Sequence, residues 1–142
     1  MTSLLRFHQA QTGNYSGYET ALREIRAGKK ASHWMWYIFP QLRGLGKSDT
    51  AQFYGLTDLE EARGYAADPV LGARLEEISR AMLEQPDPSA WSVLGHTDAM
   101  KLCSCMTLFE IADPDRKVYG QVLDRFYQGR RDARTLKLLG LL

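Results

Sequence analysis

Apolar residues recur at intervals of three and four along most of the chain, close to the 3.6 residues per turn of an α-helix. Strict alternation of apolar and polar residues over five or more positions, the sign of a half-buried strand, is absent from the sequence. The clearest helical stripe follows Asp68-Pro69 and consists of Leu71, Leu75, Ile78 and Met82. The pattern therefore predicts an all-α fold.

Local start and stop signals cut this pattern into short helices. Gly28, Gly95 and Gly140 are natural stops. Residues that suit a helix N-cap precede the apolar stripes, and these are Ser16, Thr57, Asp68, Asp87, Thr97, Asp113 and Asp132. Short helices at mixed angles build an irregular globule, which often leaves a cleft between elements. We therefore predict a single compact irregular multihelical domain over residues 1–142, with about seven or eight short helices.

Residues 32–46, SHWMWYIFPQLRGLG, concentrate aromatic side chains in one short stretch. If residues 30–39 are helical, as we expect, the helix is apolar on nearly all sides and must be central in the fold. Pro40 ends such a helix, because the residue before a proline avoids the α region. The core positions of this helix are expected to be Met35, Ile38 and Phe39.

One face of this predicted helix carries His33, Trp36, Tyr37 and Pro40, and Gln41 extends that face. The rings with polar tips, including that of Trp34 on a second face, need hydrogen-bond partners when they are buried. A segment that served only as core would use Leu and Ile instead. Two interpretations stay open, a purely structural segment and the wall of a ligand site, and we favour the second for part of the segment.

The loop that follows contains Gly46-Lys47-Ser48, which matches the end of a Walker A motif. The complete motif needs a glycine where this chain has Gln41, and it needs a preceding strand that the pattern does not predict. A P-loop is therefore excluded.

A simpler anion site is still compatible with this loop. Ser48 is expected to cap a helix that runs through Ala51 to Tyr54, and free N–H groups at its start would favour an anion. Arg43 and Lys47 would assist. The alternative is a flexible turn at Gly44 with solvated basic side chains.

Asp98 and Lys101 are three residues apart on a predicted helix and therefore share a face. Ser104 and Thr107 lie on or near the same face. The two charged residues form either a surface ion pair or part of a polar face that borders a cleft. No catalytic residue is predicted, because nothing in the spacing singles out a general base such as Glu110.

Composition and charge narrow the class of protein. With 142 residues, 44% of them hydrophobic, the chain is long enough to form one domain without a disulfide or metal staple. Its 18 Lys and Arg against 17 Asp and Glu give a net charge of +1, which argues against general nucleic-acid binding. No apolar stretch approaches the roughly 18 residues that span a bilayer, and the N-terminus turns polar too early for a secretory signal.

Cys103 and Cys105 are the two cysteines of the chain, and their spacing suits neither a disulfide nor a zinc site. His8, His33 and His96 are too scattered to suggest metal ligands. We therefore expect a cytoplasmic protein without metal or cofactor. A nucleophilic pair of Cys105 with His33 or His96 stays open as an alternative.

Three stretches, SHWMWYIFPQLRGLGKS, DPVLGARL and GHTDAMKLCSCMTLF, resemble a bacterial family known as a domain of unknown function. The family motifs are HWMWYIFPQ-x-x-GLG-x-S, P-x-LG-x-RL and D-x-x-KL-x-SSMTLF, and Cys105 stands at the second serine of the last one. The resemblance runs from Arg6-Phe7 to Thr135-Leu136 and implies an all-helical fold without an established activity. Members are often labelled calpastatin, but calpain-inhibitor segments are disordered and repeated, and this chain is compact and unrepeated.

The chain is more distantly similar to the NADAR superfamily (YbiA-like proteins), which acts on ADP-ribose derivatives and N-glycosides. This resemblance implies that stacked aromatic rings hold a base or nicotinamide and that the turn from Gly44 to Ser48 holds a phosphate. It also implies that Asp98 and Lys101 act on a ribose.

These observations predict a protein that binds or hydrolyses a small nucleotide-like ligand, such as an ADP-ribose derivative. The cleft would lie between the HWMWYIFPQ segment and the Asp98–Lys101 helix. The predicted ligand-binding residues are His33, Trp34, Trp36, Tyr37, Pro40, Gln41, Gly44, Lys47, Ser48, Asp98 and Lys101. The alternative is a protein-interaction module that uses the aromatic segment as an anchor, without catalysis. The sequence specifies no oligomeric state, and a monomer is compatible with it.

Overall fold

The computed structural model describes residues 4–13 and 15–142, and in this part of the chain it contains ten α-helices and no β-strand. The helices are α1 (Leu5–Gln11), α2 (Tyr18–Arg26), α3 (Met35–Ile38), α4 (Asp49–Tyr54), α5 (Leu59–Ala67), α6 (Leu71–Leu83), α7 (Ala90–Leu94), α8 (His96–Ala112), α9 (Val118–Tyr127) and α10 (Ala133–Leu138). An isolated bridge joins Leu42 to Leu56. The predicted all-α class is confirmed.

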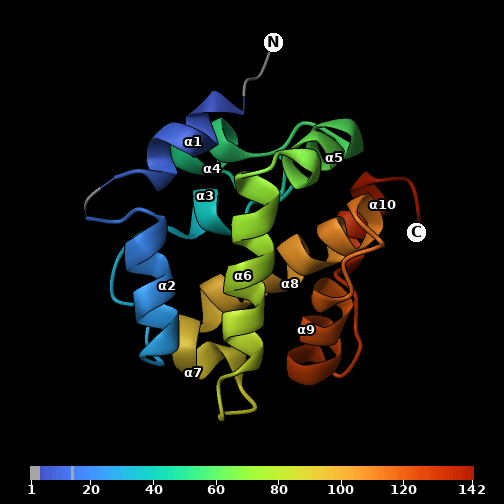
Figure 1. Ribbon diagram of the computed structural model, residues 1–142. Helices are drawn as coiled ribbons and strands as arrows, with labels where there is room; N and C mark the ends of the chain where they lie inside the picture. Colours follow the sequence, from blue (N-terminus) through green and yellow to red (C-terminus); the bar gives the residue numbers. More distant parts are fainter. Residues whose placement is uncertain (1–3, 14) are drawn as a thin grey trace.

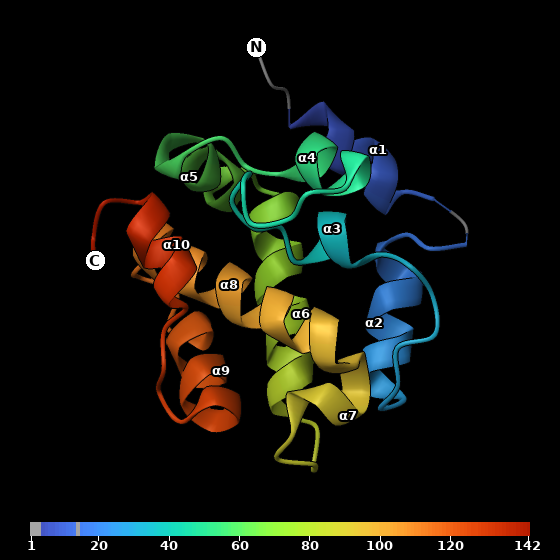
Figure 2. The ribbon, with the colours of Figure 1, turned by 180° about the vertical axis from the view of Figure 1, so that it is seen from behind.

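The two longest helices, α6 and α8, form the centre of the fold and cross each other in both views (Figures 1 and 2). Helix α6 packs against α2, α5 and α9, whereas α8 packs against α5, α7, α9 and α10. The short helices α1, α3 and α4 gather at one end, where α3 contacts both α1 and α4. The aromatic segment is thus placed between the N-terminal helices and α8.

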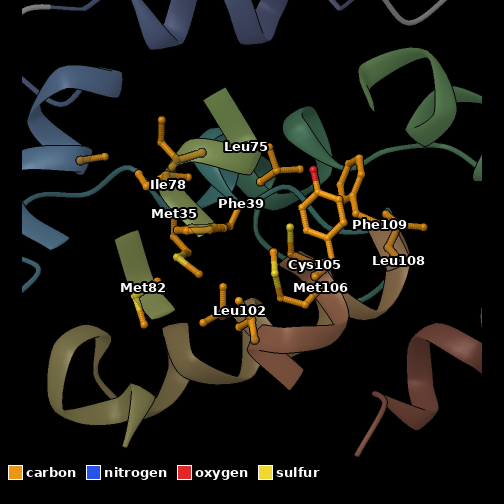
Figure 3. Packing of buried hydrophobic residues seen from close by; sticks show 14 of the residues in the cluster. Met35, Phe39, Leu75, Ile78, Met82, Leu102, Cys105, Met106, Leu108 and Phe109 are labelled. Atoms are coloured by element: carbon orange, nitrogen blue, oxygen red, sulfur yellow. The ribbon is translucent and has the colours of Figure 1, made fainter. Parts of the chain in front are cut away.

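The core between α3, α6 and α8 is built from the apolar stripes that the sequence shows (Figure 3). The predicted stripe of α6 is fully buried, and the side chains of Met35 and Phe39 pack beside it. Helix α8 contributes Leu102, Cys105, Leu108 and Phe109, all buried as predicted. Residues 104–109 are buried without interruption, so α8 is covered on every side there.

The predicted helix over residues 30–39 is wrong, because only Met35–Ile38 is helical. The carboxylate of Glu24 accepts hydrogen bonds from the backbone N–H groups of Ala31 and Ser32 at 2.7 and 2.9 Å. It also accepts from the Ser32 hydroxyl and from Trp34 Nε1. Together these bonds hold residues 31–34 as a loop against α2. The helical faces expected for this segment therefore do not exist.

The cap signals fix most helix starts to within a few residues. The side chains of Ser48 and Asp132 accept hydrogen bonds from the backbone N–H groups of Ala51 and Thr135, as predicted. Other starts shift along the chain: Asp58 caps α5 in place of Thr57, and α9 starts only at Val118, after a turn that follows Asp113.

The expected seven or eight helices are too few. Helix α1 lacks a side-chain cap at Leu4, so no local signal marks its start. Helix α3 is a four-residue remnant of the longer helix expected there.

We expect Glu24→Gln to lower the free energy of unfolding by about 2 kcal/mol at pH 7, because a neutral amide presents N–H groups to donors that now face a carboxylate. Partial burial would raise the pKa of Glu24, but the hydrogen bonds from Ser32, Ala31 and Trp34 lower it from its ordinary value of 4.5 to about 2. The carboxylate therefore contributes its full stability above about pH 4.5 and loses that contribution as the pH falls toward 2.

Urea unfolding of both proteins between pH 2 and 7 measures this difference. Glu19→Gln, at an exposed position of the same helix, is the matched control and should have little effect at any pH. A difference between wild type and Glu24→Gln that persists unchanged at pH 2 would contradict the role of the carboxylate.

Gly72→Ala should destabilise the protein by about 1–3 kcal/mol, because an added Cβ would lie 2.1 Å from the carbonyl oxygen of Ala66. The close approach of α6 to the end of α5 depends on this missing side chain. Gly64 is exposed within α5, and a Cβ added there would have only the end of the Leu4 side chain within 4 Å. Gly64→Ala should therefore raise stability by roughly 0.5–1 kcal/mol, and thermal unfolding of the two variants checks the opposite signs.

Candidate functional site

The aromatic segment divides into rings that hold the fold together and one half-buried ring, that of Trp36, which borders a small crevice beside Lys101. Trp34 is fully buried, and its Nε1 donates to the Glu24 carboxylate at 2.9 Å. Tyr37 is buried and donates its hydroxyl proton to the Ser16 carbonyl at 2.7 Å, while Gln11 bonds the Tyr37 carbonyl at 2.8 Å. Pro40 is buried as well. The side chains of Trp34, Tyr37 and Pro40 are therefore structural, which corrects their assignment as ligand-binding residues.

Trp36 is the half-buried ring of this segment, and it faces α8. The Lys101 ammonium lies 5.1 Å from the centroid of its ring. This distance is typical of a cation–π contact, which holds the lysine stem against the indole. Trp36 and Lys101 are thus on the same side of the molecule, although they are far apart in the sequence.

Asp98 is shared between two lysines. Its carboxylate lies 3.0 Å from Lys30 Nζ and 3.6 Å from Lys101 Nζ, and all three side chains are less than a quarter exposed. Lys30 also lies over the Trp34 ring, at 5.1 Å from its centroid. The cluster contains two positive charges and one negative charge, so it keeps one positive charge beside the groove.

A groove of about 240 Å³ opens beside Lys101, between the loop after α3, helix α8 and the start of α10. Its lining residues are Gln41, Leu45, Gly46, Thr97, Met100, Lys101, Ser104, Asp132 and Arg134. On the other side of Lys101, a crevice next to Trp36, Phe39 and Tyr54 holds only about 10 Å³, the space of a single water molecule. Of these two spaces beside Lys101, only the groove has room for a small molecule, and Gln41 and Lys101 border both of them.

The far wall of the groove is a hydrogen-bonded corner between α8 and α10. Asp132 Oδ2 accepts from the Ser104 hydroxyl at 3.1 Å and from the Thr135 backbone N–H at 3.0 Å. The Asp132 backbone N–H donates to the Thr107 hydroxyl at 2.9 Å, which ties the corner to the middle of α8. Next to it, Arg134 donates to the Leu45 carbonyl at 3.0 Å.

Sequence reasoning missed Asp132 and Arg134 as site residues, since it assigned Asp132 only the role of a cap. A partial signal was present, because Thr97, Lys101 and Ser104 follow one another at spacings of four and three on one face of α8.

Of the eleven predicted residues, only Gln41 and Lys101 line the groove, and four of the others, His33, Gly44, Lys47 and Ser48, are exposed outside it. Gly44 has a φ of 106°, which a glycine adopts without strain. The hydroxyl of Ser48 already accepts from the Ala51 N–H, and α4 has only six residues. The loop is therefore a capped turn, and its start offers little to a phosphate.

The groups considered for nucleophilic or basic chemistry are engaged elsewhere. Burial raises the pKa of the Cys103 thiol to about 11, helped by the charge of Asp132. Burial likewise raises the pKa of the Cys105 thiol well above its usual range, so both thiols stay protonated at neutral pH. Glu110 forms an ion pair with Arg131. These facts count against a Cys–His pair and against Glu110 as a free base.

In residues 4–13 and 15–142, no three His, Cys, Asp or Glu side chains lie close enough together to hold a metal ion. No helix in the same part of the chain is long and apolar enough to cross a membrane.

A double-mutant cycle with Lys30→Met and Asp98→Asn should give a coupling energy of about 1–2 kcal/mol, because this ion pair is largely shielded from water. The control cycle uses Glu76 and Arg80, whose side chains are 30% and 55% exposed, and should give about 0.3–0.5 kcal/mol. Urea unfolding of each variant supplies the energies. A coupling for Lys30 and Asp98 no larger than that of the control would show that Asp98 does not fix the lysines.

Comparison with known proteins agrees with the fold and leaves the activity open. The crystal structure of the conserved hypothetical protein Rv1873 from Mycobacterium tuberculosis is similar over 99% of both chains, with 40% sequence identity and a TM-score of 0.93. Among curated proteins, no significant match is found. The family described as "Protein of unknown function (DUF1810)" matches residues 1–139. The chain belongs to this family.

Proposed function

We propose that the protein binds a small nucleotide-like ligand, such as an ADP-ribose derivative, in the groove beside Lys101. One observation carries this proposal. Trp36, Gln41 and Lys101 lie together next to the groove, and Ser104 and Asp132 line its far side. A small-molecule site typically combines a concave surface with a few convergent polar groups, and this groove has both features.

The groove sets the size of the part that it holds. Its volume of about 240 Å³ is smaller than the roughly 300–1,000 Å³ of pockets that enclose a drug-sized ligand. We therefore expect one end of a nucleotide-like ligand to enter and the other end to remain at the surface. The features of the sequence that resemble the NADAR superfamily suggest ADP-ribose derivatives as the first compounds to test.

The proposal assigns roles to a shorter list of residues than the sequence suggested. Lys101 contacts the anionic part of the ligand. Gln41 supplies an amide between the groove and the small crevice next to Trp36. Asp98 is a positioning residue, because its carboxylate is occupied by Lys30 and Lys101. Trp36 supports Lys101 from the side opposite the ligand. No residue is assigned to a hydrolytic step.

The alternative, a protein-interaction module anchored by the aromatic segment, is disfavoured by burial. In this segment Trp34, Tyr37 and Phe39 are each at most 8% exposed, so they offer little surface to a partner. Large exposed apolar side chains do occur elsewhere in the structure, for example at Trp91 and Met100. They lie outside the segment that the alternative requires.

The proposed place of action is the cytoplasm. Cys103 and Cys105 are free thiols, which suits a reducing compartment.

Isothermal titration with ADP-ribose tests the proposal. Lys101→Met should weaken binding about 10- to 100-fold, because a hydrogen bond to a charged group contributes about 1.5–3 kcal/mol. Lys117→Met removes an exposed lysine outside the groove and should leave the affinity unchanged. If ADP-ribose, AMP and ADP all fail to bind, or if Lys101→Met binds as well as wild type, the proposed function is wrong.

A further inference from the structure

We infer that the groove selects a sugar phosphate, with the phosphate beside Lys101 and Arg134 and the sugar hydroxyls beside Asp132. This inference rests on the proposed function and names the chemical class of the group that enters the groove. The sugar phosphate is either a free molecule or the terminal part of a nucleotide.

The basic side of the groove carries positive charge that the fold does not fully neutralise. Lys101 shares the Asp98 carboxylate with Lys30, so the three groups together keep one positive charge. Arg134 is exposed, donates to the Leu45 carbonyl and, among the residues that the structure describes, forms no ion pair with a carboxylate. An anion between Lys101 and Arg134 would meet two cations that the fold leaves incompletely neutralised.

The acidic side offers a fixed acceptor. Asp132 Oδ2 is occupied by the Ser104 hydroxyl, the Thr135 N–H and the Thr135 hydroxyl. Its other oxygen, Oδ1, has no hydrogen-bond or ion-pair partner within the described part of the chain. A carboxylate only accepts hydrogen bonds, so it attracts sugar hydroxyls and repels a phosphate.

The two sides of the groove approach the same face of α8. Lys101 and Ser104 are three residues apart on α8, a rise of about 4.5 Å. Ser104 then bonds Asp132 at 3.1 Å. Neither Lys101 nor Arg134 pairs with Asp132 in the described structure, so the opposite charges stay available to a ligand instead of cancelling each other.

The size and the remaining polar group of the groove fit this class. Its volume of about 240 Å³ lies below the roughly 300–1,000 Å³ of pockets that enclose a drug-sized ligand, which suits a group as small as one pentose phosphate. The Gln41 carboxamide, which has no hydrogen-bond partner in the described residues, can donate and accept at the same ligand.

Titration of the wild-type protein with ribose 5-phosphate, ribose and inorganic phosphate separates the two contributions. Ribose 5-phosphate should bind at least roughly tenfold more tightly than either fragment, since it engages both sides of the groove. Equal affinity for ribose 5-phosphate and phosphate would overturn the hydroxyl contact. Equal affinity for ribose 5-phosphate and ribose would overturn the phosphate contact.

Two variants with opposite signatures sharpen the test. Asp132→Asn keeps a residue that caps helices well, so α10 should persist. It should weaken ribose 5-phosphate about tenfold and leave inorganic phosphate as tight or tighter, since the repelling charge is gone. Arg134→Gln, at an exposed position, should weaken both phosphate probes several-fold and leave ribose unchanged. If Asp132→Asn weakens both phosphate probes equally, the inference fails.

Competition with ADP-ribose distinguishes the sugar-phosphate inference from the proposed function on which it rests. If ADP-ribose binds, depends on Lys101 and is displaced by ribose 5-phosphate, both stand. If ADP-ribose binds through Lys101 but ribose 5-phosphate does not displace it, only the sugar-phosphate inference fails. If neither compound binds, the proposed function fails and the inference fails with it.

Discussion

The carboxylate of Asp98 is the contact on which the site depends, because it holds two lysines from distant parts of the chain. Lys30 precedes the aromatic segment, and Lys101 lies on the central helix α8. Joining them fixes the entry to the aromatic segment against α8 and holds the Lys101 stem over Trp36. A shielded pair of this kind contributes little net stability over an apolar alternative, but it fixes where its members lie. Here that position is the edge of the groove.

Local signals in the sequence predicted those parts of the fold that local interactions decide. The stripe of α6 and the caps at Ser48 and Asp132 depend on neighbours within a few residues, and the structure has them as predicted. The helix expected over residues 30–39 is shortened to Met35–Ile38, because Glu24 of the preceding helix holds residues 31–34 as a loop through bonds to Ala31, Ser32 and Trp34. The spacing of apolar residues does not show that a side chain of another helix binds this segment.

The same limit applies to the candidate site. The pairing of the aromatic segment with Lys101 was expected, since both stretches are rich in groups that need partners, and the structure brings Trp36 and Lys101 together. Asp132 and Arg134 were missed, because they reach the groove only after α10 docks on α8 through the Thr107 hydroxyl. That docking joins residues with no regular spacing, so only a three-dimensional arrangement shows it.

Rigid polar groups decide what kind of ligand the groove suits. Lys101 is held by Asp98, Asp132 by Ser104, and Arg134 by the Leu45 carbonyl, so each side chain is placed before a ligand arrives. Binding then orders fewer side chains and costs less entropy. A protein partner gains most from exposed aromatic surface, and here the rings of Trp34 and Tyr37 bond the fold itself. A recess with fixed charges of both signs gains most from a ligand that is itself divided into an anionic end and a hydroxyl-bearing end.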